Sequence, residues 1–359
     1  MPDNQKIQKF FKILQKNKID ATLIFNASNQ DKHVYYFTQL DVEYIFLLFL
    51  SKQQKLIILT SILEAERVKN TLPYEVITIS KSPLDIINKI LKENKIKTLS
   101  LNYNSITLNQ YNNIKPKLKY KLKDCSNLLA LIRQQKTEQE LQNIKKACEI
   151  TDNVFILTIE NINKFKTELD IAKFIKNKFH ENGVEESFPT IVASGKNAAI
   201  PHYSPKDIAL NPGFCVIDFG CKYNSYCADM TRTIYFGNPT KKELDLYNSV
   251  LTAKKQAELS VKLNNSCSIP DKIARKSLGK LQKNFIHSLG HGLGLDVHEA
   301  PNLSAKSRHK FLENTVFTIE PGIYFAEKLG IRIEDDYIIS KNGLKKLTKS
   351  SEELIIVPK

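Results

Sequence analysis

The first 130 residues alternate short apolar runs with amphipathic stretches. Five apolar runs have the length and the β-branched or aromatic content of buried strands, at 21–25, 44–50, 55–60, 74–80 and 98–102. Between some of these runs, apolar residues recur with helical spacing, as at 61–72 and 82–95. The pattern predicts an α/β domain over residues 1–130, and no segment of it carries a chemical motif that we recognise.

From residue 131 the pattern changes to long amphipathic helices followed by strands, and this order occurs twice. Three capping-box patterns open the long helices: Thr137 with Glu140, Thr167 with Asp170, and Thr240 with Glu243. Gly183 is expected to end the second helix, since glycine accepts the left-handed conformation found there. Two helices and then strands, repeated, predict a duplicated α+β unit over residues 131–359.

Composition narrows the class of protein. Hydrophobic residues make up 42% and charged residues 25% of the 359 residues, as in ordinary globular proteins. The net charge is +15, but lysines spread along the whole chain supply most of it, so we expect no nucleic-acid partner. The longest apolar run, 44–50, is too short to span a bilayer, and the N-terminus lacks a secretory pattern. The six cysteines form no C-x-x-C pair, so free thiols in the cytoplasm are expected.

The stretch HSLGHGLGLDVHE, residues 287–299, holds three of the seven histidines, His287, His291 and His298. His287 and His291 have the spacing of a helical zinc motif, but glutamate does not follow His287. Three glycines inside the stretch also disfavour a helix, at about 1 kcal/mol each relative to alanine. A metal site that uses these histidines therefore needs other ligands from elsewhere in the chain.

Two aspartates lie in the segment 214–236, in which polar residues 222–225 separate two apolar runs and predict a hairpin. A turn centred between Tyr223 and Asn224 places Asp218 directly opposite Asp229. Two like charges in such a pair repel, so we expect either a protonated aspartate or a cation between them. A slip of one residue would place the two side chains on opposite faces.

Further carboxylates come from the C-terminal strands. Glu320 ends an apolar run before a Pro-Gly turn, and strand alternation places Arg332, Glu334 and Asp336 on one face. Four carboxylates balance two divalent cations, and an oxygen-rich set with His291 as single imidazole suits Mn²⁺, Co²⁺, Fe²⁺ or Zn²⁺. Paired ions of this kind hold a water as hydroxide for attack on a carbonyl or phosphoryl group.

Each of these residues also has a structural explanation when it is taken alone. Glu320 could cap its turn, Glu334 could form a surface ion pair with Arg332, and His287 could be a hydrogen-bonded core residue. The joint occurrence of the proposed ligands is what favours a metal site.

The motifs VIDFG, CADMTRT, GHGLGLDVHE, TIEPGIY and RIEDD together resemble the pita-bread metallopeptidases, the family of methionine aminopeptidase, aminopeptidase P and prolidase. The preceding domain resembles the N-terminal domain of the aminopeptidase P, prolidase and creatinase branch. The resemblance implies an α+β pita-bread catalytic domain over 131–359, preceded by a smaller creatinase-like α/β domain over 1–130. The metal ligands that it implies are Asp218, Asp229, His291, Glu320 and Glu334.

The resemblance also implies roles for residues around the metals. In the proline-specific branch, histidines that match His202, His287 and His298 line the pocket. His202 and His298 would contact substrate and stabilise the tetrahedral intermediate, and His287 and Arg332 would support the pocket. Glu320 would also take the proton of the attacking water, and Tyr324 is a weaker candidate.

The expected activity is hydrolysis of the bond between an N-terminal residue and a following proline, as in an Xaa-Pro aminopeptidase. The alternative is an Xaa-Pro dipeptidase, or prolidase, because the motifs occur in both. A metal-free creatinase-like hydrolase and a non-catalytic binding protein are remote alternatives, since such relatives typically lose ligand carboxylates and all five ligands are present here. Two divalent ions, Mn²⁺ first and Co²⁺, Zn²⁺ or Fe²⁺ as alternatives, proline-containing peptide substrates and a homodimer are also expected, with no membrane partner.

Overall fold

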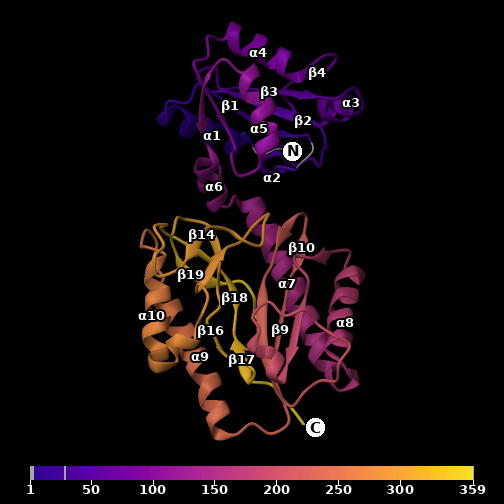
Figure 1. The fold of residues 1–359 in the computed structure, drawn as a ribbon, viewed down its shortest axis with the longest axis vertical. Coiled ribbons are helices and arrows are strands. Elements are labelled where there is room, and N and C mark those ends of the chain that lie inside the picture. Colours follow the sequence, from indigo (N-terminus) through magenta and orange to yellow (C-terminus); the bar gives the residue numbers. More distant parts are fainter. Residues whose placement is uncertain (1–3, 28–29, 359) are drawn as a thin grey trace. The chain divides into compact units, whose positions relative to one another are not determined.

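The computed structural model describes residues 4–27 and 30–358. The chain divides into two compact units, Met1–Ile132 and Arg133–Lys359 (Figure 1). Among the described helices, none is long and apolar enough to cross a membrane. All six cysteines are buried and free.

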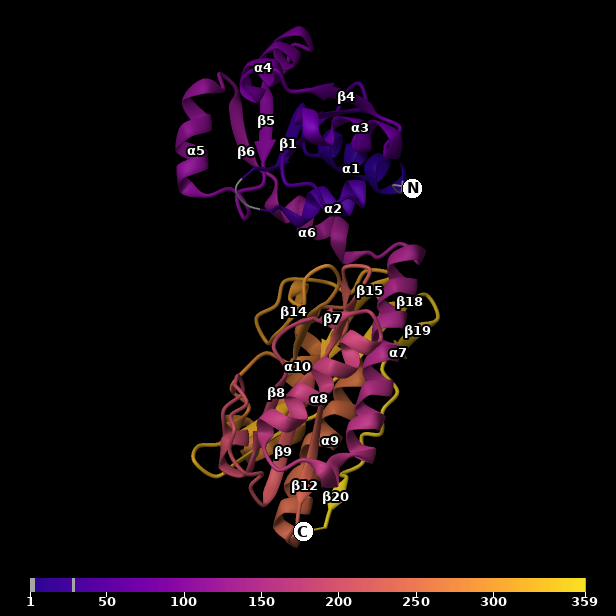
Figure 2. The same cartoon turned by 90° about the vertical axis from the view of Figure 1, so that its right-hand side faces the viewer.

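The first unit is built on a six-stranded sheet with the order β4-β3-β2-β1-β5-β6. Figure 2 shows β1, β5 and β6 of this sheet next to one another. The three central strands pair antiparallel and the other three join parallel. The strands are β1 (Ala21–Asn26), β2 (Ile45–Leu50), β3 (Lys55–Thr60), β4 (Glu75–Thr78), β5 (Thr98–Leu101) and β6 (Lys121–Asp124). The helices are α1 (Asn4–Lys16), α2 (Lys32–Thr38), α3 (Ile62–Thr71), α4 (Pro83–Glu93), α5 (Leu108–Ile114) and α6 (Ser126–Gln134), the last crossing into the second unit.

Each of the five predicted strands of this unit is present, as are the two predicted helices, α3 and α4. The pattern did not predict β6, whose central residues are alternately lysine and leucine and which lies at the sheet edge. Lysine is typical of edge strands, where it discourages pairing with another chain. Apolar side chains form the core, and one cluster joins Phe10, Phe37 and Phe49, whose ring centroids lie 4.9–5.1 Å apart.

The first half of the second unit contains α7 (Glu138–Glu160) and α8 (Glu168–Glu181), followed by strands. The capping boxes of Thr137 and Thr167 both form, and Gly183 follows α8 with φ +69°. One sheet has the order β20-β12-β9-β8, and a smaller one has the order β11-β10-β7. Their strands are β7 (Glu185–Glu186), β8 (Ile191–Ser194), β9 (Gly213–Phe219), β10 (Cys221–Tyr223), β11 (Tyr226–Cys227), β12 (Met230–Phe236) and β20 (Ile356–Val357).

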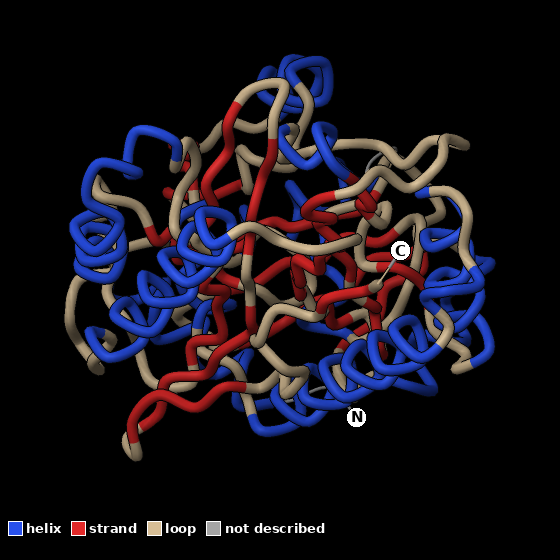
Figure 3. Tube along the Cα trace, turned by 90° about the horizontal axis from the view of Figure 1, so that it is seen from below, coloured by secondary structure: helices blue, strands red, loops and turns tan. Residues whose placement is uncertain are grey.

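The second half repeats this order with α9 (Lys241–Ser260), which Thr240 caps as predicted, and α10 (Ser268–Leu278). A five-stranded sheet has the order β14-β13-β15-β18-β19, and β16 pairs with β17. The strands are β13 (Gly290–Gly292), β14 (Glu299–Leu303), β15 (Thr315–Ile319), β16 (Gly322–Phe325), β17 (Leu329–Arg332), β18 (Asp335–Ser340) and β19 (Gly343–Lys346). Figure 3 shows helices on two sides of the strands. The predicted α+β fold with a duplicated helix-helix-strand unit is confirmed.

The predicted register of the hairpin is wrong by two positions. Asp218 pairs with Thr231, and Tyr223 pairs with Tyr226, so the turn consists of Asn224 and Ser225. These two residues have φ +47° and +69°, and positive φ at both central positions is the requirement of a tight type I′ turn. Asp229 therefore does not face Asp218 directly. Because the shift is even, both aspartates still belong to the same face.

Candidate metal centre

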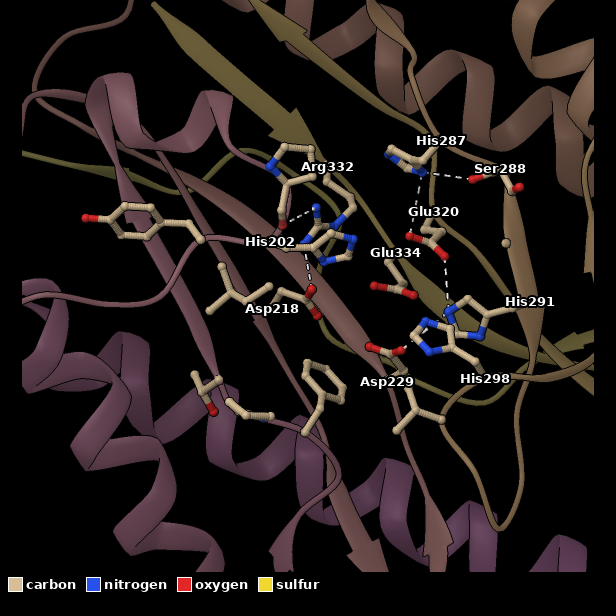
Figure 4. Close-up of a pocket in the computed structure, with 18 of the residues that line it drawn as sticks. His202, Asp218, Asp229, His287, Ser288, His291, His298, Glu320, Arg332 and Glu334 are labelled. Carbon is tan, nitrogen blue, oxygen red and sulfur yellow. Dashed lines mark hydrogen bonds and ion pairs between the residues drawn. The ribbon is translucent and has the colours of Figure 1, made fainter. Parts of the chain in front are cut away.

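A cavity of about 690 Å³ is lined by residues from both halves of the second unit. Nine of the residues that the sequence singled out line it: His202, Asp218, Asp229, His287, His291, His298, Glu320, Arg332 and Glu334. Tyr324, the weaker candidate, is not among the described residues of the lining. Figure 4 shows the side chains of these nine residues around a common space, with the four carboxylates towards its middle.

Two carboxylates come from the first half of the unit. Asp218 lies within β9, and its Oδ2 accepts a hydrogen bond of 2.5 Å from Arg332 Nη2. Asp229 precedes β12, and its backbone N–H donates to Asp336 Oδ2 at 3.0 Å. Both side chains are buried. Asp218 is held by its strand and by the bond from Arg332, and Asp229 is held by the bond from its backbone to Asp336.

The other two carboxylates come from the second half, where a strand ends or begins. Glu320 follows β15, and its N–H donates to the carbonyl of Leu289 at 2.8 Å. Glu334 lies between β17 and β18, and its N–H donates to the carbonyl of Thr231 at 3.1 Å. Each half therefore contributes two carboxylates, as expected of a site between duplicated units.

His291 lies in β13 and brings an imidazole to this group. Its Nε2 is 3.2 Å from Glu320 Oε1 and 3.7 Å from Asp229 Oδ2. The strand approaches β15 so closely that a Cβ on Gly290 would lie 2.1 Å from the carbonyl oxygen of Thr318. Glycine is thus required for the position of His291, and the stretch is a strand and loop, not a helix.

The electrostatics of the carboxylates differ. Burial raises the pKa of Asp229 well above its usual range, and neighbouring carboxylates, Glu334 first, raise it further. The pKa of Glu334 rises for the same reasons, burial first and then the charge of Glu320. Burial also raises the pKa of Glu320, but the hydrogen bond and charge of His291 outweigh it and lower this pKa to about 2.

The donor set fits divalent cations. Three of the four site carboxylates each have one buried oxygen without a hydrogen-bond partner among the described residues: Asp218 Oδ1, Asp229 Oδ1 and Glu334 Oε1. Ligand atoms of Asp229, His291 and Glu334 all lie within 4.8 Å of one another. A buried, unpaired carboxylate oxygen is costly, and Arg332 is the one arginine or lysine among the described residues that line the cavity. Divalent cations would supply both the missing partners and the missing positive charge.

The other histidines lie around this group. The rings of His291 and His298 form an edge contact with centroids 4.2 Å apart. His287 Nδ1 lies 2.8 Å from the carbonyl of Ser288 and Nε2 lies 3.1 Å from Tyr324 Oη, and burial lowers its pKa. His202 and His298 are exposed at the cavity and therefore accessible to a ligand.

Arg332 is buried and pairs with Asp218, so the alternative of a surface ion pair with Glu334 is wrong. Its Nε donates to Thr231 Oγ1 at 3.0 Å and its Nη1 to Tyr324 Oη at 2.8 Å. Thr231 was not predicted, yet its hydroxyl also donates to Glu334 Oε2 at 2.6 Å. The sequence could have identified Thr231 from its position two residues after Asp229, because alternate residues of a strand lie on the same face.

Residues 142–341 match metallopeptidase family M24, and residues 6–135 match the creatinase/prolidase N-terminal domain. The chain belongs to metallopeptidase family M24. The family implies divalent metal ions, in agreement with the donor set of the site. These matches confirm the predicted resemblance of the second domain to the pita-bread metallopeptidases and of the first domain to the creatinase-like N-terminal domain.

Three similar proteins cover nearly the whole of this M24 chain. A curated Xaa-Pro dipeptidase from Pyrococcus furiosus is 35% identical over 98% of this chain and 99% of its own length. The structure of an Xaa-Pro dipeptidase from Bacillus anthracis has a TM-score of 0.90 at 29% identity, covering 98% of this chain and 99% of that one. The structure of an X-Pro aminopeptidase from Thermotoga maritima has a TM-score of 0.85 at 32% identity, covering 95% and 98%.

Proposed function

We propose that this metallopeptidase is an Xaa-Pro dipeptidase, a prolidase, that uses two divalent ions. The observation that carries the proposal is the full-length similarity to the Pyrococcus furiosus Xaa-Pro dipeptidase, and it is supported by the five proposed ligand residues, which all line one cavity. The relatives thus favour the alternative over the aminopeptidase that was the first interpretation of the sequence. The motifs alone did not separate the two, because the metal chemistry is common to both.

The proposed metal ligands are Asp218, Asp229, His291, Glu320 and Glu334, with Mn²⁺ as the first candidate ion and Co²⁺, Zn²⁺ and Fe²⁺ as alternatives. Bound divalent ions polarise a carbonyl and lower the pKa of water. The buried oxygens without partners and the scarcity of cationic side chains support this assignment.

The protein residues would orient the peptide and move the proton. Glu320, whose carboxylate faces the cavity beside His291, would accept the proton of the attacking water and pass it to the proline nitrogen. His202 and His298, exposed at the cavity, would contact the substrate and stabilise the developing oxyanion. His287 and Arg332 would act as supports, because their polar atoms are engaged by protein groups.

One observation favours the aminopeptidase as a second candidate. A dipeptidase must recognise the free carboxylate of proline, for which a fixed cation is the usual partner. Among the described residues that line the cavity, Arg332 is the one arginine or lysine, and Asp218, Tyr324 and Thr231 already engage its guanidinium. Only the histidines remain as candidate cationic partners.

Product analysis of Ala-Pro and Ala-Pro-Ala by mass spectrometry distinguishes the two activities. The protein is stripped of metal and reloaded with Mn²⁺ before both peptides are offered. Release of alanine from Ala-Pro alone supports the dipeptidase, whereas release from both peptides, or from the tripeptide alone, supports the aminopeptidase. Cleavage of neither peptide by metal-loaded protein would overturn the proposed specificity for Xaa-Pro bonds.

A further inference from the structure

Glu299 follows His298 in the chain and is among the residues that line the cavity, but its side chain is buried, with 5% exposed. Its Oε1 accepts hydrogen bonds from Arg133 Nη2 and, at 3.0 Å, from the backbone N–H of Asp296. Its Oε2 accepts a hydrogen bond of 3.2 Å from Lys136 Nζ. Both oxygens of the carboxylate therefore have defined partners, and the two cationic partners belong to a segment distant in sequence.

The cluster of Glu299, Arg133 and Lys136 consists of one acidic and two basic side chains. Burial raises the pKa of Glu299, but the charges of Lys136 and Arg133 outweigh it and lower the pKa to about 2. The exposed fractions of the Arg133 and Lys136 side chains are 9% and 1%. Buried ion pairs of this kind add little net stability over apolar packing, because desolvation offsets the attraction. Their value lies in fixing one geometry.

The geometry that the cluster fixes is that of the loop between β13 and β14. A Cβ on Gly294 would lie 2.6 Å from Glu299 Oε1, so the loop backbone lies directly against the carboxylate. Asp296 is tied twice, by its N–H to Glu299 and by its Oδ2 to Arg133 Nη2 at 2.7 Å. His298 is the last residue of this loop, and its ring lies against His291.

We propose that Glu299, held by Arg133 and Lys136, is a positioning residue that sets the orientation of His298 towards the substrate. The inference rests on the proposed function, in which His298 contacts the substrate. Glu299 itself need not touch the substrate, because its two oxygens are occupied by protein donors. Neutralising it leaves Arg133 and Lys136 without their common partner and loosens the loop that carries His298.

A double-mutant cycle on kcat/KM tests the coupling. Glu299→Gln is expected to lower kcat/KM by about 10- to 100-fold, as small misplacements of a positioned group do. In a His298→Ala background the same change is expected to cost less than about twofold, because the group that it positions is gone. The matched control is Glu313→Gln, the same substitution at a side chain that is 39% exposed, and it should leave kcat/KM unchanged. An equal loss in both backgrounds would overturn the proposal.

A measurement without catalysis separates this proposal from the proposed function. In metal-free protein labelled at histidine, the side-chain NMR signal of His298, assigned with His298→Gln, should shift or broaden in Glu299→Gln. The signal of His180, on α8, should not change. Lys136→Met, which leaves the contact between Arg133 and Glu299, should produce a smaller change of the same kind. An unchanged His298 signal in both variants contradicts the proposal, whichever peptides the enzyme cleaves.

Discussion

Glu334 and Asp335 are neighbours in the chain, both are buried, and their electrostatic situations are opposite. Glu334 faces the cavity among other carboxylates, and its pKa is raised well above its usual range, by burial first. Asp335 points the other way, where Arg232 Nη2 lies 2.6 Å from its Oδ1 and Lys254 Nζ lies 2.7 Å from its Oδ2. Burial raises the pKa of Asp335 as well, but these two cations lower it far below its usual range.

The cluster around Glu334 and the cluster around Asp335 differ in their balance of positive and negative side chains. Behind the site, three cations meet three carboxylates, namely Arg232, Lys254 and Lys346 with Asp335, Glu258 and Glu352. In the cavity, the four carboxylates proposed as metal ligands share one arginine, and the fifth carboxylate of the lining, Glu299, pairs with Arg133 and Lys136. The comparison teaches that buried carboxylates alone do not indicate a metal site. What indicates one is the lack of protein cations, since the missing charge must come from elsewhere.

The largest expected effect comes from Asp229→Asn. Loss of this carboxylate should lower kcat/KM by at least ~1000-fold, about 4 kcal/mol at 1.36 kcal/mol per tenfold change. The free energy of unfolding of the metal-free protein should not fall, because one of several repelling buried charges has been removed. Steady-state kinetics and urea unfolding measure the two quantities. Turnover like that of the unchanged protein would contradict the ligand assignment.

Asp335→Asn, unlike Asp229→Asn, should destabilise the metal-free protein. It removes the carboxylate with which Arg232 pairs and one of the three with which Lys254 pairs, which should lower the free energy of unfolding by ~3–5 kcal/mol. Urea unfolding of the metal-free variant, next to Asp229→Asn, makes the comparison direct. Equal stability of the two variants would mean that the cluster behind the site is not held together by its ion pairs.

Addition of Mn²⁺ should stabilise the protein through the cavity cluster alone. At a free concentration of about 100 times Kd, the expected gain is ~2.7 kcal/mol for one site. Thermal unfolding with increasing Mn²⁺ measures the gain, and Asp229→Asn serves as the variant that should lose it. A gain of the same size in that variant would place the ion outside the proposed site.

The smallest expected effect is the pH dependence of the metal-free protein. Asp336, which accepts the N–H of Asp229, has a pKa raised from 3.8 to about 8 by burial. A carboxyl group whose pKa is higher in the folded state stabilises the fold at low pH and loses this contribution as pH rises through the folded value. Stability should therefore increase by at least ~1 kcal/mol from pH ~8 to pH ~5, and the raised pKa values of Asp229 and Glu334 act in the same direction.

Asp335 has the opposite pH dependence. Its pKa is lowered in the folded state, so the stability that it contributes is lost only when the pH falls below the pKa of this aspartate in the unfolded chain. Thermal unfolding across this range, with a chelator present, measures the combined effect. A midpoint that falls steadily from neutral to mildly acidic pH would contradict the raised pKa values in the cavity.

Much of the fold could be predicted from local patterns. The capping boxes at Thr137, Thr167 and Thr240 identified helix starts because the bonds they make span only three residues. The five strands of the first unit were recognised from their apolar runs. Short elements, such as α2 and β6, were missed because seven and four residues are too few to establish a periodicity.

The sequence by itself determined the kinds of residues available to the site, their order, and the face of each strand on which they lie, since strand alternation is a local property. It did not determine which residues meet. The tertiary structure decided that Asp218 pairs with Thr231 across the hairpin, that Arg332 binds Asp218 and not Glu334, and that cations surround Asp335. Some of these partners lie about 100 residues apart, and the others depend on the exact position of the turn. The alternation of apolar and polar residues along the chain predicts neither. Whether a buried carboxylate is an ion-pair partner or a candidate metal ligand is therefore settled only when the chain has folded.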